Sequence, residues 1–341
     1  MSVFIFAIYL YSCIFFQFDK KIKFHTLILY LKNNPKRNII VKKSPFARIK
    51  QLLPLVLIIC TISQINATTV VFDAGGVLVQ TKKSEIVKKM IGKFISYALF
   101  SWKNPAHIKT LTFTVMEELY GKQVPEEGCP CACGDGIILP ALMCTWLSSS
   151  ISSDEIAEIT GKKIGEPITG KEIIECTCKC IDDGSCNNLL HDRREKELVK
   201  SILCIMFDPE MHANFTHPIP EGVKLLEECA KKEKNCIMLL SNYAADAFEQ
   251  IYNKQEMQDA IFRFIRPEYL VVSGFLGMIK PYKSIFNHLV SGYNLDPATI
   301  VFIDDQEENI QMAKQCGWKT VHLKDNNYKA ARAELKLLGV L

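Results

Sequence analysis

The chain has 341 residues, of which 14 are cysteine, and a formal net charge of +4. With 48% hydrophobic and 23% charged residues, its composition excludes a disordered chain, a collagen-like chain and a membrane protein with many spans. The charge is unevenly distributed: residues 1–67 hold ten Lys/Arg and one acid, whereas the rest hold 31 Lys/Arg and 36 acids. The body is mildly acidic, which argues against nucleic acid as a partner.

The basic leader, residues 1–67, contains two apolar runs. The second, Leu52–Ile62, follows several basic residues and predicts a secretory signal with cleavage near Ala67; a buried element of the fold is the alternative. A true start near Val41 would explain why this signal lies so deep in the chain. Otherwise the first run, Ser2–Phe18, is itself a signal or a membrane anchor. We therefore expect an exported body (periplasmic, secretory or extracellular) or a membrane-tethered one, rather than a cytoplasmic protein.

After the leader, short apolar runs alternate with segments of helical periodicity. The predicted strands are Thr69–Phe72, Ile237–Leu240, Tyr269–Val272, Ile300–Ile303 and Thr320–Leu323. The predicted helices among the later strands are Ala245–Tyr252, Ser284–Leu289, Glu307–Cys316 and Tyr328–Leu338. This alternation predicts an α/β fold with a Rossmann-like parallel sheet that is covered on both faces.

The first predicted strand is separated from the others by a long insertion. Residues 81–215 are predicted to form a mainly helical cap domain, with helices over Ser84–Phe100, Ile108–Tyr120 and Glu195–Phe207. The cap contains a Gly- and Cys-rich insert, residues 121–190, in which no helix is predicted. The catalytic core is then formed by residues 68–80 and 216–341. The histidines near the end of the insertion, His212 and His217, are interpreted as surface or loop residues.

Polar residues follow the predicted strands where the strands end. Asp73 follows the first strand, Ser241 and Asn242 follow the next, and Asp304 and Asp305 end a later one. Lys280 precedes a proline in a loop. Because active sites of open parallel sheets lie at the carboxyl ends of the strands, we expect these side chains to converge.

This set of residues suits phosphoryl transfer to a carboxylate. Asp73 is the candidate nucleophile, and with Asp304 it can hold Mg²⁺, which prefers carboxylate oxygens. Lys280 supplies positive charge to the transferring group and Ser241 a hydrogen bond to a phosphoryl oxygen, with Asn242 also expected to bind substrate. The glycines after the nucleophile, Gly75 and Gly76, let the backbone approach the phosphate.

These four segments, in this order, resemble the motifs of the haloacid dehalogenase-like (HAD) hydrolase superfamily. The opening Asp-Ala-Gly-Gly-Val-Leu and the segments LLSN and GMIKPYKSIF are similar to a subgroup that includes sugar-phosphate phosphatases and epoxide-hydrolase-like members. The resemblance implies a Mg²⁺-dependent phosphatase acting on a small phosphorylated metabolite. It implies metal ligation by Asp73, the Gly75 carbonyl and Asp304, with Asp305 in support, and a cap that closes over the substrate.

One position departs from the phosphatases that the sequence resembles. Most of them carry a second Asp two residues after the nucleophile, and this residue protonates the leaving group; here the position is Gly75. Three explanations compete. Either the subgroup works without this acid, or the chemistry is that of a dehalogenase-type hydrolase, or the protein is a weakly active or non-catalytic envelope binding protein.

The insert holds eight cysteines in two groups of four. The first comprises Cys129, Cys131, Cys133 and Cys144, and the second Cys176, Cys178, Cys180 and Cys186. In an exported protein this density favours disulfides, whose pairing the sequence leaves open. Two tetrathiolate zinc sites are the rival interpretation, and free thiols are the third. The other body cysteines, Cys204, Cys229, Cys236 and Cys316, are predicted to be small buried residues.

Overall fold

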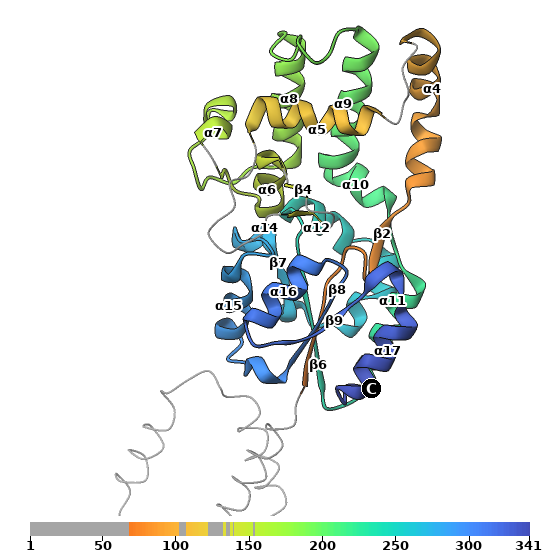
Figure 1. The fold of residues 1–341 in the computed structure, drawn as a ribbon, viewed down its shortest axis with the longest axis vertical. Coiled ribbons are helices and arrows are strands. Elements are labelled where there is room, and N and C mark those ends of the chain that lie inside the picture. The colour runs from red at the N-terminus through yellow and green to blue at the C-terminus, as the bar shows by residue number, and fades with distance from the viewer. Residues whose placement is uncertain (1–67, 102–106, 122–131, 134–136, 139, 153) are drawn as a thin grey trace, which may run out of the picture. The chain divides into compact units, whose positions relative to one another are not determined.

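A computed structural model describes residues 68–341, apart from 102–106, 122–131, 134–136, 139 and 153 (Figure 1). The predicted leader lies outside the described residues. The described chain belongs to one compact unit, residues 64–341. Among the described residues, no helix is both long and apolar enough to cross a membrane.

A five-stranded parallel sheet forms the centre of the core. The strands are β1 (Thr68–Phe72), β6 (Asn235–Ser241), β7 (Leu270–Val272), β8 (Ile300–Asp304) and β9 (Lys319–His322). Their order in the sheet is β7-β6-β1-β8-β9, and every neighbouring pair is parallel. The predicted Rossmann-like sheet is confirmed, and β1 lies at its centre. Every residue of β8 is buried, as expected for a strand covered on both faces.

Helices cover both faces of this sheet. One face packs against α11 (Pro220–Ala230), α12 (Ala245–Tyr252) and α17 (Tyr328–Leu337) in a hydrophobic cluster that includes Val70 and Phe72. The other face packs against α15 (Lys283–Gly292) and α16 (Glu307–Gln315) in a cluster that includes Val71 and Phe302. Because successive side chains of a strand point to opposite faces, β1 contributes to both clusters.

The chain leaves and re-enters the core through an antiparallel pair, β2 (Val79–Thr81) and β5 (Thr216–Pro218). Between these strands lie seven described helices, which we call the cap (Figure 1). They are α4 (Lys83–Ser101), α5 (His107–Tyr120), α6 (Ala141–Ser148), α7 (Asp154–Thr160), α8 (Gly170–Asp182), α9 (Arg193–Phe207) and α10 (Pro209–Phe215). The buried side chains of the cap join the same hydrophobic cluster as α11, α12 and α17. The domain boundaries stay a prediction.

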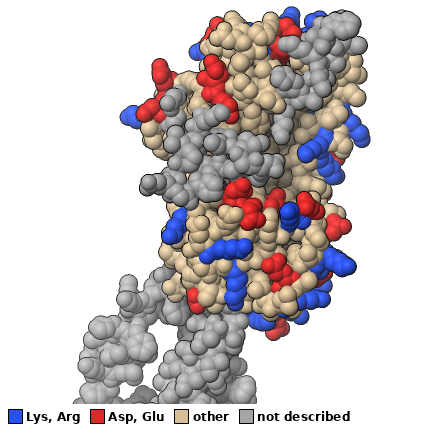
Figure 2. All heavy atoms as spheres, viewed as in Figure 1, with Lys and Arg blue, Asp and Glu red and all other residues tan. Residues whose placement is uncertain are grey.

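Smaller elements complete the described chain. They are β3 (Ala132–Cys133), β4 (Ile137–Ile138), α13 (Gln255–Ala260), α14 (Ser273–Leu276) and 3₁₀ turns at Phe262–Phe264, Pro267–Tyr269, Pro297–Thr299 and Lys324–Asn326. On the face shown in Figure 2, the described Lys/Arg and Asp/Glu side chains are interspersed, and no continuous basic surface covers that face.

The sequence predicted no particular helix within residues 121–190, but α6, α7 and α8 lie there. Helix α8 begins with a capping box: Thr169 accepts a hydrogen bond from the Glu172 backbone, and Glu172 accepts one from the Thr169 backbone. Such reciprocal bonds satisfy backbone donors that a helix start leaves open. The C-x-C sequence of Cys176, Cys178 and Cys180 therefore lies on a regular helix.

The four cysteines of the second group, Cys176, Cys178, Cys180 and Cys186, are free thiols. The disulfide interpretation is therefore not supported for these residues. The zinc interpretation is not supported either, since the metal-ligand cluster found among described residues is made of aspartates. Cys129 and Cys131 lie outside the described residues. Cys229 is buried as predicted, whereas Cys204, Cys236 and Cys316 are half-buried.

Candidate active site

The carboxyl ends of the central strands bring the predicted side chains together. Asp73 follows β1, Ser241 ends β6 and Asp304 ends β8. The register pairs Phe72 with Leu239 on one side and with Ile303 on the other, so these strand ends are adjacent. One carboxylate oxygen each from Asp73, Asp304 and Asp305 lies within 4.8 Å of the others. The structure therefore assembles the predicted carboxylates at one edge of the sheet.

Lys280 bridges two of these carboxylates. Its Nζ lies 2.8 Å from Asp73 Oδ1 and 2.7 Å from Asp304 Oδ2, and all three residues are buried. Burial alone would lower the pKa of Lys280, but Asp304 and Asp73 outweigh it, so this pKa is raised. The ammonium is therefore held in its charged form beside Asp73.

Burial raises the pKa of the Asp73 carboxyl to about 7, against the opposing effect of Lys280. Asp304 and Asp305 raise it further, because like charges disfavour ionisation. Burial also raises the pKa of Asp305 to about 6, and the neighbouring Asp304 adds to this rise. The site thus carries more negative charge than Lys280 alone neutralises.

Asn309 fixes the orientation of Asp304. Its Nδ2 donates to both carboxylate oxygens of Asp304, at 3.1 and 3.0 Å, from the first turns of α16. The backbone N–H of Gln306 donates to Asp304 Oδ1 at 2.8 Å. Asp304 is therefore held by donors on three sides. Asp305 differs, because its buried Oδ1 has no hydrogen-bond partner among the described residues.

Gly76 allows Asp305 to approach the loop after β1. Its φ is +74°, a conformation that favours glycine, and a Cβ built on it would clash with the carboxylate of Asp305. At Gly75 the nearest atom to such a Cβ is Asp73 Oδ2, at 4.0 Å. The two glycines that the sequence singled out therefore have different roles, and only Gly76 needs to be glycine for steric reasons.

The Ser241-Asn242 pair also divides its roles. Ser241 is buried at the end of β6, next to the strand that carries Asp73. The side-chain amide of Asn242 makes two hydrogen bonds to the backbone of Lys280: its Nδ2 donates to the carbonyl and its Oδ1 accepts from the N–H, both at 2.8 Å. Asn242 therefore positions Lys280 in the structure, and its predicted contact with substrate stays a prediction.

The residues of this site fit a magnesium ion. Oxygen ligands are what this cation prefers, and three carboxylates offer them within 4.8 Å of one another. The unpartnered buried oxygen of Asp305 adds an acceptor that a cation would satisfy. Asp73, Asp304 and Asp305 would hold the ion, and the carbonyl of Gly75 stays a predicted ligand.

Sequence reasoning overlooked Tyr243 and misplaced His212. Tyr243 directly follows Asn242, and that adjacency was the available signal. His212 was interpreted as a surface or loop residue, but it is half-buried on α10, where its ring contacts those of Trp146 and Tyr243. Burial lowers its pKa to about 4, so His212 is neutral at physiological pH. His217 lies on β5 and pairs with Glu85.

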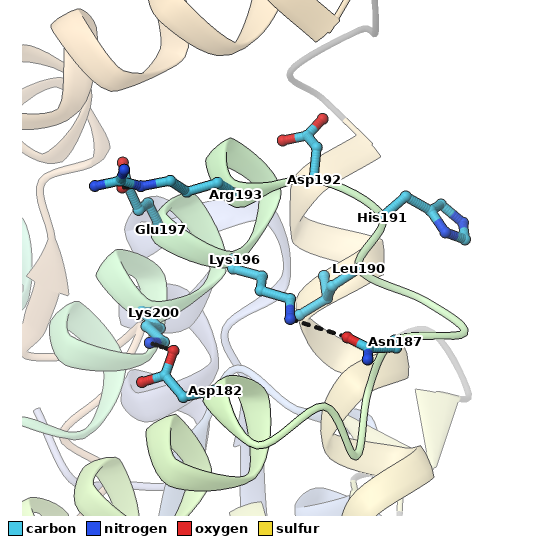
Figure 3. Close-up of a pocket in the computed structure, with 9 residues that line it drawn as sticks. All are labelled: Asp182, Asn187, Leu190, His191, Asp192, Arg193, Lys196, Glu197 and Lys200. Carbon is cyan, nitrogen blue, oxygen red and sulfur yellow. Dashed lines mark hydrogen bonds and ion pairs between the residues drawn. The ribbon is translucent and has the colours of Figure 1, made fainter.

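Apart from this site, a hollow lies in the cap, between the end of α8 and the first turns of α9 (Figure 3). Its volume is about 460 Å³. Its charged groups are paired with one another: Lys200 with Asp182 and Arg193 with Glu197, while Lys196 donates to Asn187. These three pairs account for six of the nine residues that line the hollow.

No family model and no curated protein matches the chain. Solved structures with a similar fold include one described as a predicted HAD-like family hydrolase from Porphyromonas gingivalis, which is 16% identical, with a TM-score of 0.39 and coverage of 80% of this chain and 98% of that one.

Two further structures show the range of chemistry among these neighbours. A HAD family enzyme from Bacteroides thetaiotaomicron, in complex with magnesium and inorganic phosphate, is 18% identical, with a TM-score of 0.37 and coverage of 75% and 93%. The L-2-haloacid dehalogenase from Xanthobacter autotrophicus, with chloropropionic acid covalently bound, is 13% identical, with a TM-score of 0.41 and coverage of 81% and 84%.

Proposed function

We propose that this protein is a magnesium-dependent hydrolase of the HAD-like superfamily that releases phosphate from a small phosphomonoester. The observation that carries the proposal is the buried cluster of Asp73, Asp304 and Asp305 around Lys280, with one oxygen of Asp305 unpartnered. A single lysine leaves this carboxylate cluster under-compensated, which favours a site for a divalent cation.

In this proposal Asp73 is the nucleophile. One of its carboxylate oxygens forms a bond to phosphorus while the bond from phosphorus to the leaving-group oxygen breaks. Water then attacks the phosphorus of the aspartyl-phosphate, which releases inorganic phosphate and regenerates Asp73. When bound, magnesium would screen the repulsion between the anionic nucleophile and the phosphate.

The neighbouring side chains would orient and neutralise the transferring group. Lys280 is held next to Asp73 by two ion pairs and by the contact of Asn242 with its backbone, and its ammonium can stabilise negative charge on the phosphoryl oxygens. The hydroxyl of Ser241, at the adjacent strand end, can donate a hydrogen bond to another of these oxygens.

The test is phosphate release from a panel of small phosphate esters, with and without Mg²⁺. We expect release that needs the metal and that Asp73→Asn abolishes. As a matched control, Asp296→Asn removes a carboxylate that caps a 3₁₀ turn away from the cluster, and it should retain activity. Halide release from 2-haloacids without phosphate release would favour the dehalogenase-type alternative. Metal binding without turnover of either kind would favour the envelope binding protein.

A further inference from the structure

The proposed function assigns no residue that donates a hydrogen bond to the leaving-group oxygen of the substrate. At the position two residues after the nucleophile, Gly75 has no side chain that could donate to the leaving-group oxygen. A leaving group that departs as an alkoxide or phenoxide carries developing negative charge, and a donor placed there contributes to the rate. The inference below rests on the proposed function and concerns the residue that supplies this donor.

Tyr243 is held rigidly beside the nucleophile. Its backbone N–H donates to Ser273 Oγ at 3.0 Å, and its carbonyl accepts from the Gly274 N–H at 3.0 Å. A side chain at Gly274 would clash with the backbone of this loop, so the close approach depends on glycine. Tyr243 thus leaves the end of β6, next to β1, in a fixed direction.

The Tyr243 ring lies between the cap and the loop that carries Asp73. Its centroid is 5.7 Å from that of the cap residue His212, at a tilt of 72°, and 6.3 Å from that of Phe248. With Ala74, the residue after the nucleophile, Tyr243 lines a small apolar cavity of about 10 Å³. The residue is only 9% exposed, so the ring has little freedom to turn away.

The hydroxyl of Tyr243 is available as a donor. It makes no hydrogen bond to any residue that the structure describes, although its backbone makes several. Burial, and secondarily the negative charge of Asp73, raise the pKa of Tyr243 above its usual value. The hydroxyl therefore keeps its proton at neutral pH. Its place near the nucleophile loop follows from the cavity that Tyr243 lines together with Ala74.

The direction of attack decides which substrate atom this donor can reach. An in-line displacement by Asp73 places the leaving-group oxygen on the side of phosphorus away from the core. That side faces the cap, and the Tyr243 ring is in contact with the cap through His212. We propose that the Tyr243 hydroxyl donates a hydrogen bond to the leaving-group oxygen of the substrate, in place of the side chain that Gly75 lacks.

The test compares Tyr243→Phe with the wild type on two aryl phosphates. Phenyl phosphate has the more basic leaving group and 4-nitrophenyl phosphate the less basic one. Since kcat/KM reports the step in which the leaving group departs, Tyr243→Phe should lower it about tenfold to a hundredfold for phenyl phosphate and clearly less for 4-nitrophenyl phosphate. Inhibition by inorganic phosphate, which has no leaving group, should stay within about twofold of the wild type.

The matched control is Tyr252→Phe, which removes the hydroxyl of a neighbouring tyrosine that stacks on Phe248 from α12. It should leave both kcat/KM values unchanged, and thermal melting should show that both variants are folded. An equal loss on the two substrates, or no loss, would overturn the role of Tyr243 while leaving the proposed function in place. A wild type that releases phosphate from neither substrate would overturn both.

Discussion

Gly76 determines how closely Asp305 can approach the loop that follows β1. With a φ of +74° and no room for a Cβ beside the Asp305 carboxylate, Gly76→Ala faces backbone strain and a steric clash at once. We expect it to lower the free energy of unfolding by roughly 1–3 kcal/mol and to weaken Mg²⁺ binding, because Asp305 is pushed from the cluster. Urea unfolding and titration calorimetry with Mg²⁺ measure the two effects.

The adjacent glycine provides the control. Gly75 does not have a positive φ, and the nearest atom to a Cβ built there is 4.0 Å away. Gly75→Ala should therefore change the free energy of unfolding by less than about 0.5 kcal/mol. If both variants were equally stable, the close packing of Gly76 against Asp305 would not constrain the loop.

At the scale of single residues, the sequence predicted which side chains converge at one edge of the sheet, because the strand ends determine their positions. Asp73, Ser241 and Asp304 each follow a short apolar run, and parallel strands bring such positions together. Roles that depend on the direction of a side chain could not be predicted from the sequence. Asn242 was expected at the substrate but contacts the Lys280 backbone, and Tyr243 was overlooked because an aromatic residue after a strand is usually core.

At the scale of elements, prediction succeeded where hydrophobic periodicity was strong and failed where capping governs. The five strands and four of the core helices, α12, α15, α16 and α17, were predicted to within a few residues, whereas α11, α13 and α14 were not predicted. The helix α8 was overlooked because three cysteines at alternate positions obscure its apolar face and its capping box, Thr169 with Glu172, was not considered. The hydrogen bonds at the start of this helix thus mark an element that the composition of the segment had left unassigned.

Ser273 links α6 of the cap to the core loop that carries Tyr243. Its Oγ donates to the carbonyl of Leu147 at 2.6 Å and accepts from the Tyr243 N–H at 3.0 Å. Ser273 is fully buried, so Ser273→Ala leaves both backbone groups without their partner. We expect a loss of roughly 1–3 kcal/mol in the free energy of unfolding, measured by urea denaturation.

Ser291→Ala is the control, because it removes a serine hydroxyl that does not link the cap to the core. Ser291 lies exposed on α15, and its Oγ donates to the Asn287 carbonyl of the same helix at 2.9 Å. Ser291→Ala should change stability by less than about 0.5 kcal/mol. Equal losses in the two variants would contradict the role of Ser273 in joining cap and core.

At the scale of the whole molecule, the cap and the core share one hydrophobic cluster, which the sequence alone could not show. The strand run of Val70 and Phe72 and the helical run of Leu198 and Leu203 are far apart along the chain, yet their side chains join that cluster. Such pairing depends on tertiary packing that periodicity does not encode. The sequence predicted that a helical cap exists, but which of its faces would meet the core was left open.

The same carboxylates that form the candidate metal site link the stability of the molecule to pH. Without metal, the folded state raises the pKa of Asp73 to about 7 and that of Asp305 to about 6, above the ordinary value of 3.8. Between about pH 4 and pH 7 the folded state therefore holds protons that the unfolded chain has released. The free energy of unfolding of the metal-free protein should fall as pH rises through this range.

Magnesium should reverse this loss, and more so at higher pH. The cation binds the ionised carboxylates, so below about pH 6 protons compete with it and above about pH 7.5 they do not. We expect millimolar Mg²⁺ to raise the melting temperature by several degrees more at about pH 8 than at about pH 5.5, as measured by calorimetry at matched ionic strength. Asp305→Asn should shrink the difference. An equal shift at both pH values would mean that Mg²⁺ binds elsewhere, since only a site whose ligands must lose protons links metal binding to pH in this direction.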